Sequence, residues 1–165
     1  MRSYESKILS VETMRKVRDQ FRQDGRTLAF TNGCFDLIHS GHAELLAFAR
    51  QQGDALVVGL NSDASVRSIK GNNRPIIPEK ERARLLAAFE AVDYVVLFEE
   101  DRVDHLLSLI LPDVLVKGAD WKHDVHGREI VEQHNGRVVL APVVQGQSTT
   151  SIMHKILASA KNAPE

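Results

Sequence analysis

Short apolar runs alternate with stretches of helical periodicity along all 165 residues of the chain. Five of these runs have the length and composition of buried parallel strands: residues 27–30, 55–60, 93–98, 114–116 and 138–140. Between them, apolar residues recur three and four positions apart, as they do in amphipathic helices. This alternation predicts an α/β fold with a doubly wound, parallel, five-stranded sheet and helices on both faces. We expect one domain over residues 1–165, with an N-terminal helix at about 10–25 and a core at about 26–160.

The helical stretches also predict which side chains enter the core. Ser10 is the expected N-cap of the first helix. A helix from about residue 79 is expected to bury its apolar side chains, namely Leu85, Leu86, Phe89 and Val92. The next helical stripe consists of Val103, Leu106, Leu107 and Ile110. The last helix is expected to turn three apolar residues inward, namely Ile152, Ile156 and Leu157.

Composition excludes several classes of protein. The net charge of −1, with 43% hydrophobic and 26% charged residues, is typical of a soluble globular domain and gives no basic field for nucleic acid or an anionic membrane. No apolar run approaches the roughly 20 residues of a membrane span. The first six residues lack the apolar centre of a signal peptide. The single cysteine, Cys34, excludes an internal disulfide. We therefore expect a cytoplasmic protein.

The segment from Thr31 to His42 combines a strand end, a glycine-bearing turn and a helix start. The free N–H groups and the dipole of a helix start favour a bound anion, so this junction predicts a phosphate site. His39 and His42 are three residues apart and share one helix face, where two imidazoles suit a phosphate chain that gains charge during a reaction. Cys34 is interpreted as a small residue whose backbone approaches phosphate, because no activating pattern surrounds it.

A second helix entrance follows the last predicted strand, at Gly146–Ile152. Its first turn carries the hydroxyls of Ser148, Thr149 and Thr150, which could bind phosphate through short, directed hydrogen bonds. The alternative is simple N-capping, which Ser148 or Thr149 would supply alone.

Other polar residues follow the predicted strands. Asn61 lies at the carboxyl end of a strand, where ligands bind in open α/β sheets. Lys70 and Arg74 lie in a loop from which they could reach phosphate oxygens, although solvated surface cations are an equal alternative. His123 and His126 have no third ligand nearby, so we predict no protein metal site.

The run T-N-G-C-F-D-L-I-H-S-G-H resembles the H-x-G-H motif of the cytidylyltransferase-like nucleotidyltransferases. In that superfamily a Ser/Thr-rich helix start closes over the nucleotide opposite the motif, and the segment from Gly146 matches it in the expected order. Nearly the whole chain is similar to the adenylyltransferase domain of the bacterial enzymes that make ADP-heptose from heptose 1-phosphate and ATP. The matching segments are residues 30–36, 58–66, 70–75, 91–96 and 113–118.

This resemblance implies a Rossmann-like nucleotidyltransferase fold and assigns roles residue by residue. The implied catalytic residues are His39, His42 and Lys70. The implied nucleotide-binding residues are Gly33, Cys34, Phe35, Asn61, Lys117, Gly118, Asp120, Ser148, Thr149 and Thr150. Asp36 and Arg74 are expected to bind the acceptor. ATP is the expected co-substrate, with Mg²⁺ bound through its phosphates rather than in a protein cage.

The resemblance leaves alternatives for the substrate and the partners. Glycerol-3-phosphate cytidylyltransferases carry R-T-E-G-I-S-T-T before the last helix, where this chain has Val143, Val144, Gln145 and Gln147 in place of Arg, Thr, Glu and Ile. FMN adenylyltransferases share the motifs, and a nucleotide-binding regulatory module without turnover is the alternative that is not an enzyme. Expected partners are a sugar kinase on a separate chain, which would supply the substrate, and a second copy in a homodimer.

Overall fold

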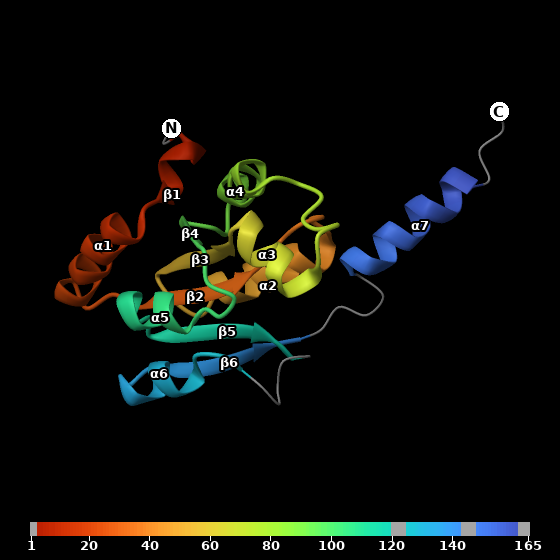
Figure 1. Ribbon diagram of the computed structural model, residues 1–165. Coiled ribbons are helices and arrows are strands. Elements are labelled where there is room, and N and C mark those ends of the chain that lie inside the picture. The colour runs from red at the N-terminus through yellow and green to blue at the C-terminus, as the bar shows by residue number, and fades with distance from the viewer. Residues whose placement is uncertain (1–2, 120–124, 143–147, 162–165) are drawn as a thin grey trace.

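A computed structural model describes residues 3–119, 125–142 and 148–161 of the chain (Figure 1). The strands are β1 (Ile8–Leu9), β2 (Leu28–Gly33), β3 (Ala55–Asn61), β4 (Tyr94–Phe98), β5 (Val114–Gly118) and β6 (Arg137–Ala141). The helices are the short 3₁₀ helix η1 (Tyr4–Lys7) followed by α1 (Val11–Gln23), α2 (Ser40–Arg50), α3 (Asp63–Lys70), α4 (Glu79–Ala88), α5 (Asp104–Ile110), α6 (Arg128–Gln133) and α7 (Thr149–Lys161). Within the described ranges, no helix has both the length and the apolarity needed to cross a membrane.

The strands form one parallel sheet in the order β1-β4-β3-β2-β5-β6. The predicted α/β fold with a parallel sheet is confirmed, and all five predicted strands are present. The sixth strand, Ile8–Leu9, was missed because two residues are too short to show a strand periodicity. It extends the sheet by pairing with Val95 and Val96 of β4.

Alternate residues of the strands pack into two separate apolar layers, which lie on opposite faces of the sheet. Helices α1, α5 and α6 cover one layer, to which β2 contributes Leu28 and Phe30. Helices α2 and α4 cover the other layer, to which β2 contributes Ala29. Since both faces are buried, the strands read as continuous apolar runs rather than as alternating ones.

The N-terminal helix α1 is fixed to the sheet by one buried arginine. Ser10 caps the helix as predicted, its hydroxyl accepting the N–H of Thr13 at 3.1 Å. The guanidinium of Arg18 donates to both carboxylate oxygens of Asp113, at 2.7 and 2.8 Å, and to the carbonyl of Leu111. This bidentate pair joins α1 to the start of β5 and was not predicted, because the sequence does not show that Arg18 is buried.

The inward face of α4 differs from the prediction. The buried residues are Arg82, Ala83, Leu86 and Ala87, whereas the side chain of Leu85 is 44% exposed. Arg82 lies on the same buried stripe as Leu86, one turn before it, and Leu85 lies outside that stripe. Phe89 and Val92 contribute to the core from beyond the helix end at Ala88.

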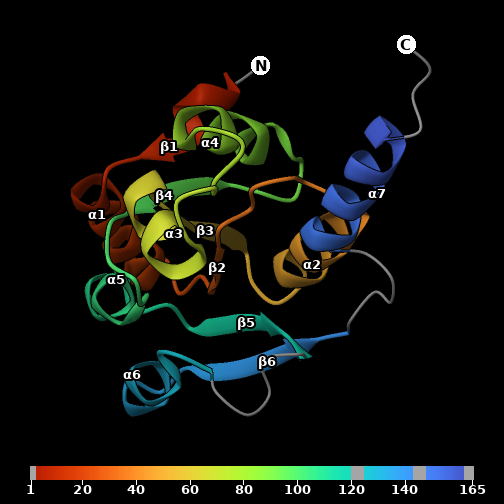
Figure 2. The same ribbon diagram turned by 45° about the vertical axis from the view of Figure 1, so that its right-hand side comes forward.

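The prediction for the last helix was also wrong at two positions. Ile156 and Leu157 are each 58% exposed. Thr149 and Met153, in the first turns of α7, contact the other described residues, and the helix then projects away from the sheet (Figures 1 and 2). Its far apolar residues consequently have no surface to pack against among the described residues.

Candidate active site

The junction between β2 and α2 places the two motif histidines against a buried aromatic ring. Phe35 has a φ of 44°, a conformation that bulky residues rarely adopt, and its ring packs in the core beside Gly33. A Cβ on Gly33 would lie 3.3 Å from that ring, so glycine gives the ring its room. The ring centroid of Phe35 lies 5.1 Å from that of His42. Because the side chain of Phe35 packs in the core, we expect Phe35 to contact a nucleotide only through its backbone. Its ring acts indirectly, by supporting His42.

His39 and His42 form a stacked pair at the entrance of α2. Their ring centroids are 3.8 Å apart, with 25° between the ring planes. In both residues Nδ1 is buried and has no hydrogen-bond partner among the described residues. Nε2 is the other nitrogen of each ring, and we expect a ligand to bind there. The helix itself has no side-chain cap, and within the described ranges the N–H groups of Ser40 and Gly41 have no acceptor. The entrance therefore presents both imidazole and backbone donors to an anion.

Burial disfavours the charged form of both histidines in the free protein. Burial lowers the pKa of His39 below its ordinary value of 6.5. Burial, with smaller contributions from His39 and the cation of Lys70, lowers the pKa of His42 to about 4. A bound polyphosphate would oppose these effects, because a nearby negative charge stabilises the imidazolium.

The low pKa of His42 predicts a loss of stability on mild acidification. Below about pH 6.5, His42 takes up a proton in the unfolded chain, whereas in the folded chain it stays neutral down to about pH 4. The free energy of unfolding should therefore fall as the pH drops through this window. Urea unfolding at pH 7 and pH 5 measures the effect, and the loss should be smaller in a His42→Asn variant. An equal loss in both proteins would contradict it.

Asp36 and Arg74 are bound to each other instead of facing solvent. The carboxylate of Asp36 is 1% exposed and accepts the Nε–H of Arg74 at 2.6 Å. It also accepts the backbone N–H groups of Ile76 and Ile77. Burial acts to raise the pKa of Asp36, but these two N–H donors and the Arg74 cation outweigh it and hold the pKa below its ordinary value. For Asp36 to bind acceptor hydroxyls, as the resemblance implies, a ligand would have to share or displace these bonds.

Arg74 also connects the loop to the last helix. Its Nη1 donates to the Sδ of Met153 in α7, at 2.9 Å. Its Nη2 is buried without a partner among the described residues. The side chain is 12% exposed, so it is not the solvated surface cation of the alternative interpretation. One donor of this guanidinium thus remains for a ligand at the place where the loop, the motif segment and α7 meet.

Arg82 is a second buried guanidinium at the site, and sequence reasoning missed it. It is fully buried and donates to the carbonyls of Cys34 and Ile77 and to the carboxylate of Asp63. It therefore joins the motif loop to the 71–78 loop and to the start of α3. The only sequence signal was an arginine at a position of the α4 stripe where apolar residues are the norm.

Lys70 and Cys34 lie within electrostatic range of each other. Burial raises the pKa of the Cys34 thiol, while the nearby cation of Lys70 acts in the opposite direction. A raised pKa favours the thiol over the thiolate, and the thiol is the poorer nucleophile. The charge of Lys70 also acts on His42, so the end of α3 faces the histidine pair.

The sheet opens between β2 and β5 before either strand ends. The last paired residues are Phe30 and Leu115, yet β2 continues to Gly33 and β5 continues to Gly118. The strand order reverses at this point, with β3 and β4 on one side and β5 and β6 on the other. Ligands of open parallel sheets bind in the crevice at such a switch point.

Three predicted nucleotide-binding residues lie at strand ends of this edge. Lys117 is 6% exposed in β5, and Gly118 ends the strand. Asn61 ends β3, and its amide donates to the hydroxyl of Ser65 at 2.9 Å, which orients the start of α3. The predicted contact residue Asp120 lies outside the described residues.

The start of α7 lies against the histidine motif, as two motifs sharing one ligand require. The hydroxyl of Thr149 donates to the carbonyl of Leu37 at 3.4 Å. Ser148 caps the helix, its hydroxyl accepting the N–H of Ser151 at 3.0 Å, which supports the capping interpretation for that residue. The hydroxyl of Thr150 is exposed and has no partner among the described residues. Gly146 and Gln147 lie outside the described part of the chain.

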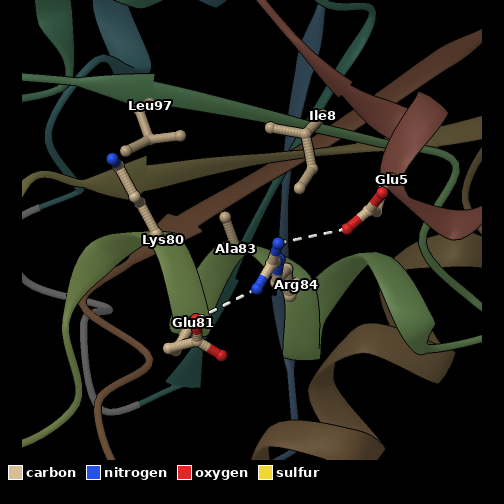
Figure 3. A pocket seen from close by; sticks show the side chains of 7 residues that line it. All are labelled: Glu5, Ile8, Lys80, Glu81, Ala83, Arg84 and Leu97. Carbon is tan, nitrogen blue, oxygen red and sulfur yellow. Dashed lines mark hydrogen bonds and ion pairs between the residues drawn. The ribbon is translucent and has the colours of Figure 1, made fainter.

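The described residues contain no group of three or more His, Cys, Asp and Glu side chains arranged to hold a metal ion, while His123 is outside them. A cavity of about 340 Å³ lies elsewhere, between α4 and the N-terminal segment (Figure 3). Its charged lining consists of Glu5, Lys80, Glu81 and Arg84, with Arg84 paired to both acids. Because none of the motif residues lines it, this cavity is not the candidate site.

The sequence from residue 30 to residue 158 matches the family model described as cytidylyltransferase-like. The chain belongs to the cytidylyltransferase-like family. It is accordingly a nucleotidyltransferase, as the motifs predicted. Similar curated proteins include the bifunctional protein HldE of Syntrophotalea carbinolica, which is 51% identical over 155 residues. The HldE of Geobacter sulfurreducens is 48% identical over 154 residues. These matches cover 93% of this chain but 32% and 31% of the relatives, so the chain spans about a third of their length.

Solved structures share the fold of this cytidylyltransferase-like chain at low sequence identity. The lipopolysaccharide core biosynthesis protein of Thermoplasma volcanium matches with a TM-score of 0.59 and 23% identity, over 74% of this chain and 100% of its own. The pantothenate synthetase of Thermus thermophilus matches with a TM-score of 0.59 and 18% identity, over 84% of this chain and 62% of its own. Both support the Rossmann-like arrangement of the sheet and the helices.

Proposed function

We propose that this nucleotidyltransferase transfers AMP from ATP to D-glycero-β-D-manno-heptose 1-phosphate, giving ADP-heptose and pyrophosphate. The observation that carries the proposal is the convergence of two helix entrances, with Thr149 of α7 bonded to the motif segment that presents His39 and His42. Such an arrangement suits a polyphosphate held from both sides. The identity of the acceptor is supported by the heptose-enzyme resemblance and by about 50% identity to the HldE proteins.

In the proposed reaction, a phosphate oxygen of the sugar 1-phosphate attacks the α-phosphorus of ATP. The bond between this phosphorus and the oxygen bridging to the β-phosphate breaks, and pyrophosphate leaves with the electron pair. Nε2 of His39 and His42 and the N–H groups at the entrance of α2 stabilise the charge on the phosphates. Positioning and charge stabilisation are sufficient for phosphoryl transfer, so no covalent enzyme intermediate is required.

Cationic side chains complete the phosphate site. The charge of Lys70, at the end of α3, acts on His42, and we assign to the acceptor phosphate the buried Nη2 of Arg74, which has no partner among the described residues. Both oxygens of Asp36 accept N–H donors of the protein, so this carboxylate does not offer a protein site for Mg²⁺. We therefore propose that Mg²⁺ binds through the phosphates of the nucleotide. Such an ion would supply charge neutralisation to the bound phosphates.

The relatives are about three times as long as this chain and are named bifunctional, so other activities accompany this domain there. We propose that the acceptor is supplied by a sugar kinase on another chain, that the enzyme acts in the cytoplasm, and that it forms a homodimer. A pyrophosphate-release assay tests the reaction. ATP and CTP are each offered with heptose 1-phosphate, glycerol 3-phosphate and FMN. Release from ATP that depends on heptose 1-phosphate is the expected result, and the absence of release in all six combinations would favour the regulatory module.

The hydroxyls at the start of α7 should contribute to nucleotide affinity. Loss of one hydrogen bond to a charged phosphate costs roughly 1.5–3 kcal/mol, so Thr149→Ala and Thr150→Ala should each weaken ATP binding about tenfold or more. Calorimetric titration measures the affinity, and thermal unfolding of the same variants measures stability. Unchanged affinity with lowered stability would instead return these residues to a capping role.

A further inference from the structure

The side-chain amide of Asn32, near the end of β2, has no hydrogen-bond partner among the described residues, and its Oδ1 is buried. Buried polar atoms in native proteins are almost always paired, so an unpaired one beside a binding crevice calls for a ligand. The residue as a whole is half-buried, so its side chain lies at the boundary between the core and the surface.

Asn32 lies on the opposite face of the sheet from the histidine pair. Its neighbour across the ladder is Gly59, and a Cβ built on Gly59 would lie 3.2 Å from the Cβ of Asn32 and 3.2 Å from Leu106 of α5. The amide therefore belongs to the α5 side, whereas α2 and its histidines cover the other side. A Cβ on Gly59 would lie 2.7 Å from the ring of Phe30, so glycine at this position allows Phe30, Asn32 and Leu106 to pack together.

The same face of the crevice receives Lys117 from β5. In that strand Leu115 belongs to the α5 layer, so Lys117, two residues further on, points to the same side. Asn32 and Lys117 thus line one wall of the opening between β2 and β5, on the side away from α2 and α4.

We propose that Asn32 is a specificity-determining residue whose Oδ1 accepts a hydrogen bond from the nucleoside of the bound nucleoside triphosphate. This inference rests on the proposed function, which places the phosphates at the entrance of α2 and the acceptor beside Asp36 and Arg74. Both of these lie on the α2 and α4 side, so the nucleoside is the part of the ligand that crosses to Asn32. Two nucleoside groups have the required donor chemistry, a ribose hydroxyl and the exocyclic amino group of the base.

The test compares Asn32→Leu, which keeps the volume and removes the amide, with Thr31→Val. Thr31 is the matched control, because it precedes Asn32 in the same strand and its buried hydroxyl also has no partner among the described residues, but Thr31 as a whole is fully buried whereas Asn32 is half-buried. The calorimetric probes are ATP and inorganic tripolyphosphate, which lacks a nucleoside. Asn32→Leu should bind ATP about tenfold more weakly and bind tripolyphosphate as the wild type does. Thr31→Val should bind both as the wild type does.

The wild-type chain supplies a second measurement that does not depend on how the variant folds. It is titrated with 2′-deoxy-ATP, 3′-deoxy-ATP and inosine triphosphate, which lacks the amino group. The analogue that lacks the hydrogen-bond donor to Asn32 should bind about tenfold more weakly than ATP. That analogue should show no further loss with Asn32→Leu. In steady-state kinetics the KM for ATP should rise while kcat at saturation is kept.

Two outcomes would overturn the inference while leaving the proposed function intact. One is an unchanged ATP affinity in Asn32→Leu, and the other is an equal loss for ATP and tripolyphosphate. A wild-type protein that binds tripolyphosphate but discriminates against none of the analogues would also overturn it. A wild-type protein that binds no nucleoside triphosphate at all would overturn the proposed function itself, together with this inference.

Discussion

Replacing either His39 or His42 by alanine should lower kcat roughly 10²–10³-fold, the usual cost of removing one donor that stabilises transition-state charge. The two rings stack at 3.8 Å and are held by the buried ring of Phe35, so their positions are set before a ligand arrives. The binding of ATP alone should change less, because the interaction strengthens as charge develops on the phosphates. Steady-state pyrophosphate release at saturating substrates measures kcat, and equilibrium titration measures binding.

His134→Ala is the matched control for the histidine variants. His134 lies exposed just after α6, where its Nδ1 is hydrogen-bonded to the carbonyl of Ile130, so its loss should leave kcat within about twofold. Near-wild-type turnover in both His39→Ala and His42→Ala would disprove the proposed mechanism. A loss in kcat matched by an equal loss of folded protein would attribute the effect to the structure instead.

The second large effect is expected on stability, from Arg82→Met. This change keeps an unbranched apolar chain in the core but removes a guanidinium that serves the Cys34 and Ile77 carbonyls and the Asp63 carboxylate. Removing one partner from a buried ion pair costs roughly 3–5 kcal/mol. For a chain of this size that cost corresponds to a fall in Tm on the order of 10 °C. Urea and thermal unfolding both measure it.

The control for Arg82→Met is Arg84→Met in the same helix. Arg84 pairs with Glu5 and with Glu81 of its own helix in the lining of the cavity of Figure 3, but its side chain is 51% exposed. Exposed ion pairs contribute about 0–1 kcal/mol, so this variant should be nearly as stable as the wild type. Equal destabilisation by both variants would show that the three contacts of Arg82 add nothing beyond those of an ordinary surface arginine.

The strands and the phosphate motif were predictable from sequence because each depends on local signals. Continuous apolar runs identified every strand that is buried on both faces, and the H-x-G-H segment identified the entrance of α2. The start of α7 contacts the motif segment through Thr149, which is consistent with the arrangement that the family resemblance implied.

The contacts that hold the site together were not predictable, because they join residues far apart in the chain. Arg82 binds the carbonyl of Cys34 across 48 positions, and Arg74 reaches Met153 across 79. Local periodicity treats an arginine as a surface residue, so it could not indicate burial at either place. The wrong prediction for Leu85 had the same cause, because the buried stripe of α4 includes Arg82 and leaves Leu85 exposed.

The early parting of β2 and β5 also has a consequence for motion. Two residue pairs join these strands, whereas six join β2 to β3 and five join β5 to β6. The sheet thus consists of a four-stranded part and a two-stranded part that are joined by few residue pairs. Proteins open locally in cooperative units, and a weakly paired boundary of this kind can separate two of them. A nucleotide that contacts both β2 and β5 would hold the two parts of the sheet together. Amide hydrogens of β5 and β6 would then exchange more slowly with bound ligand, and product release would return the sheet to its looser state.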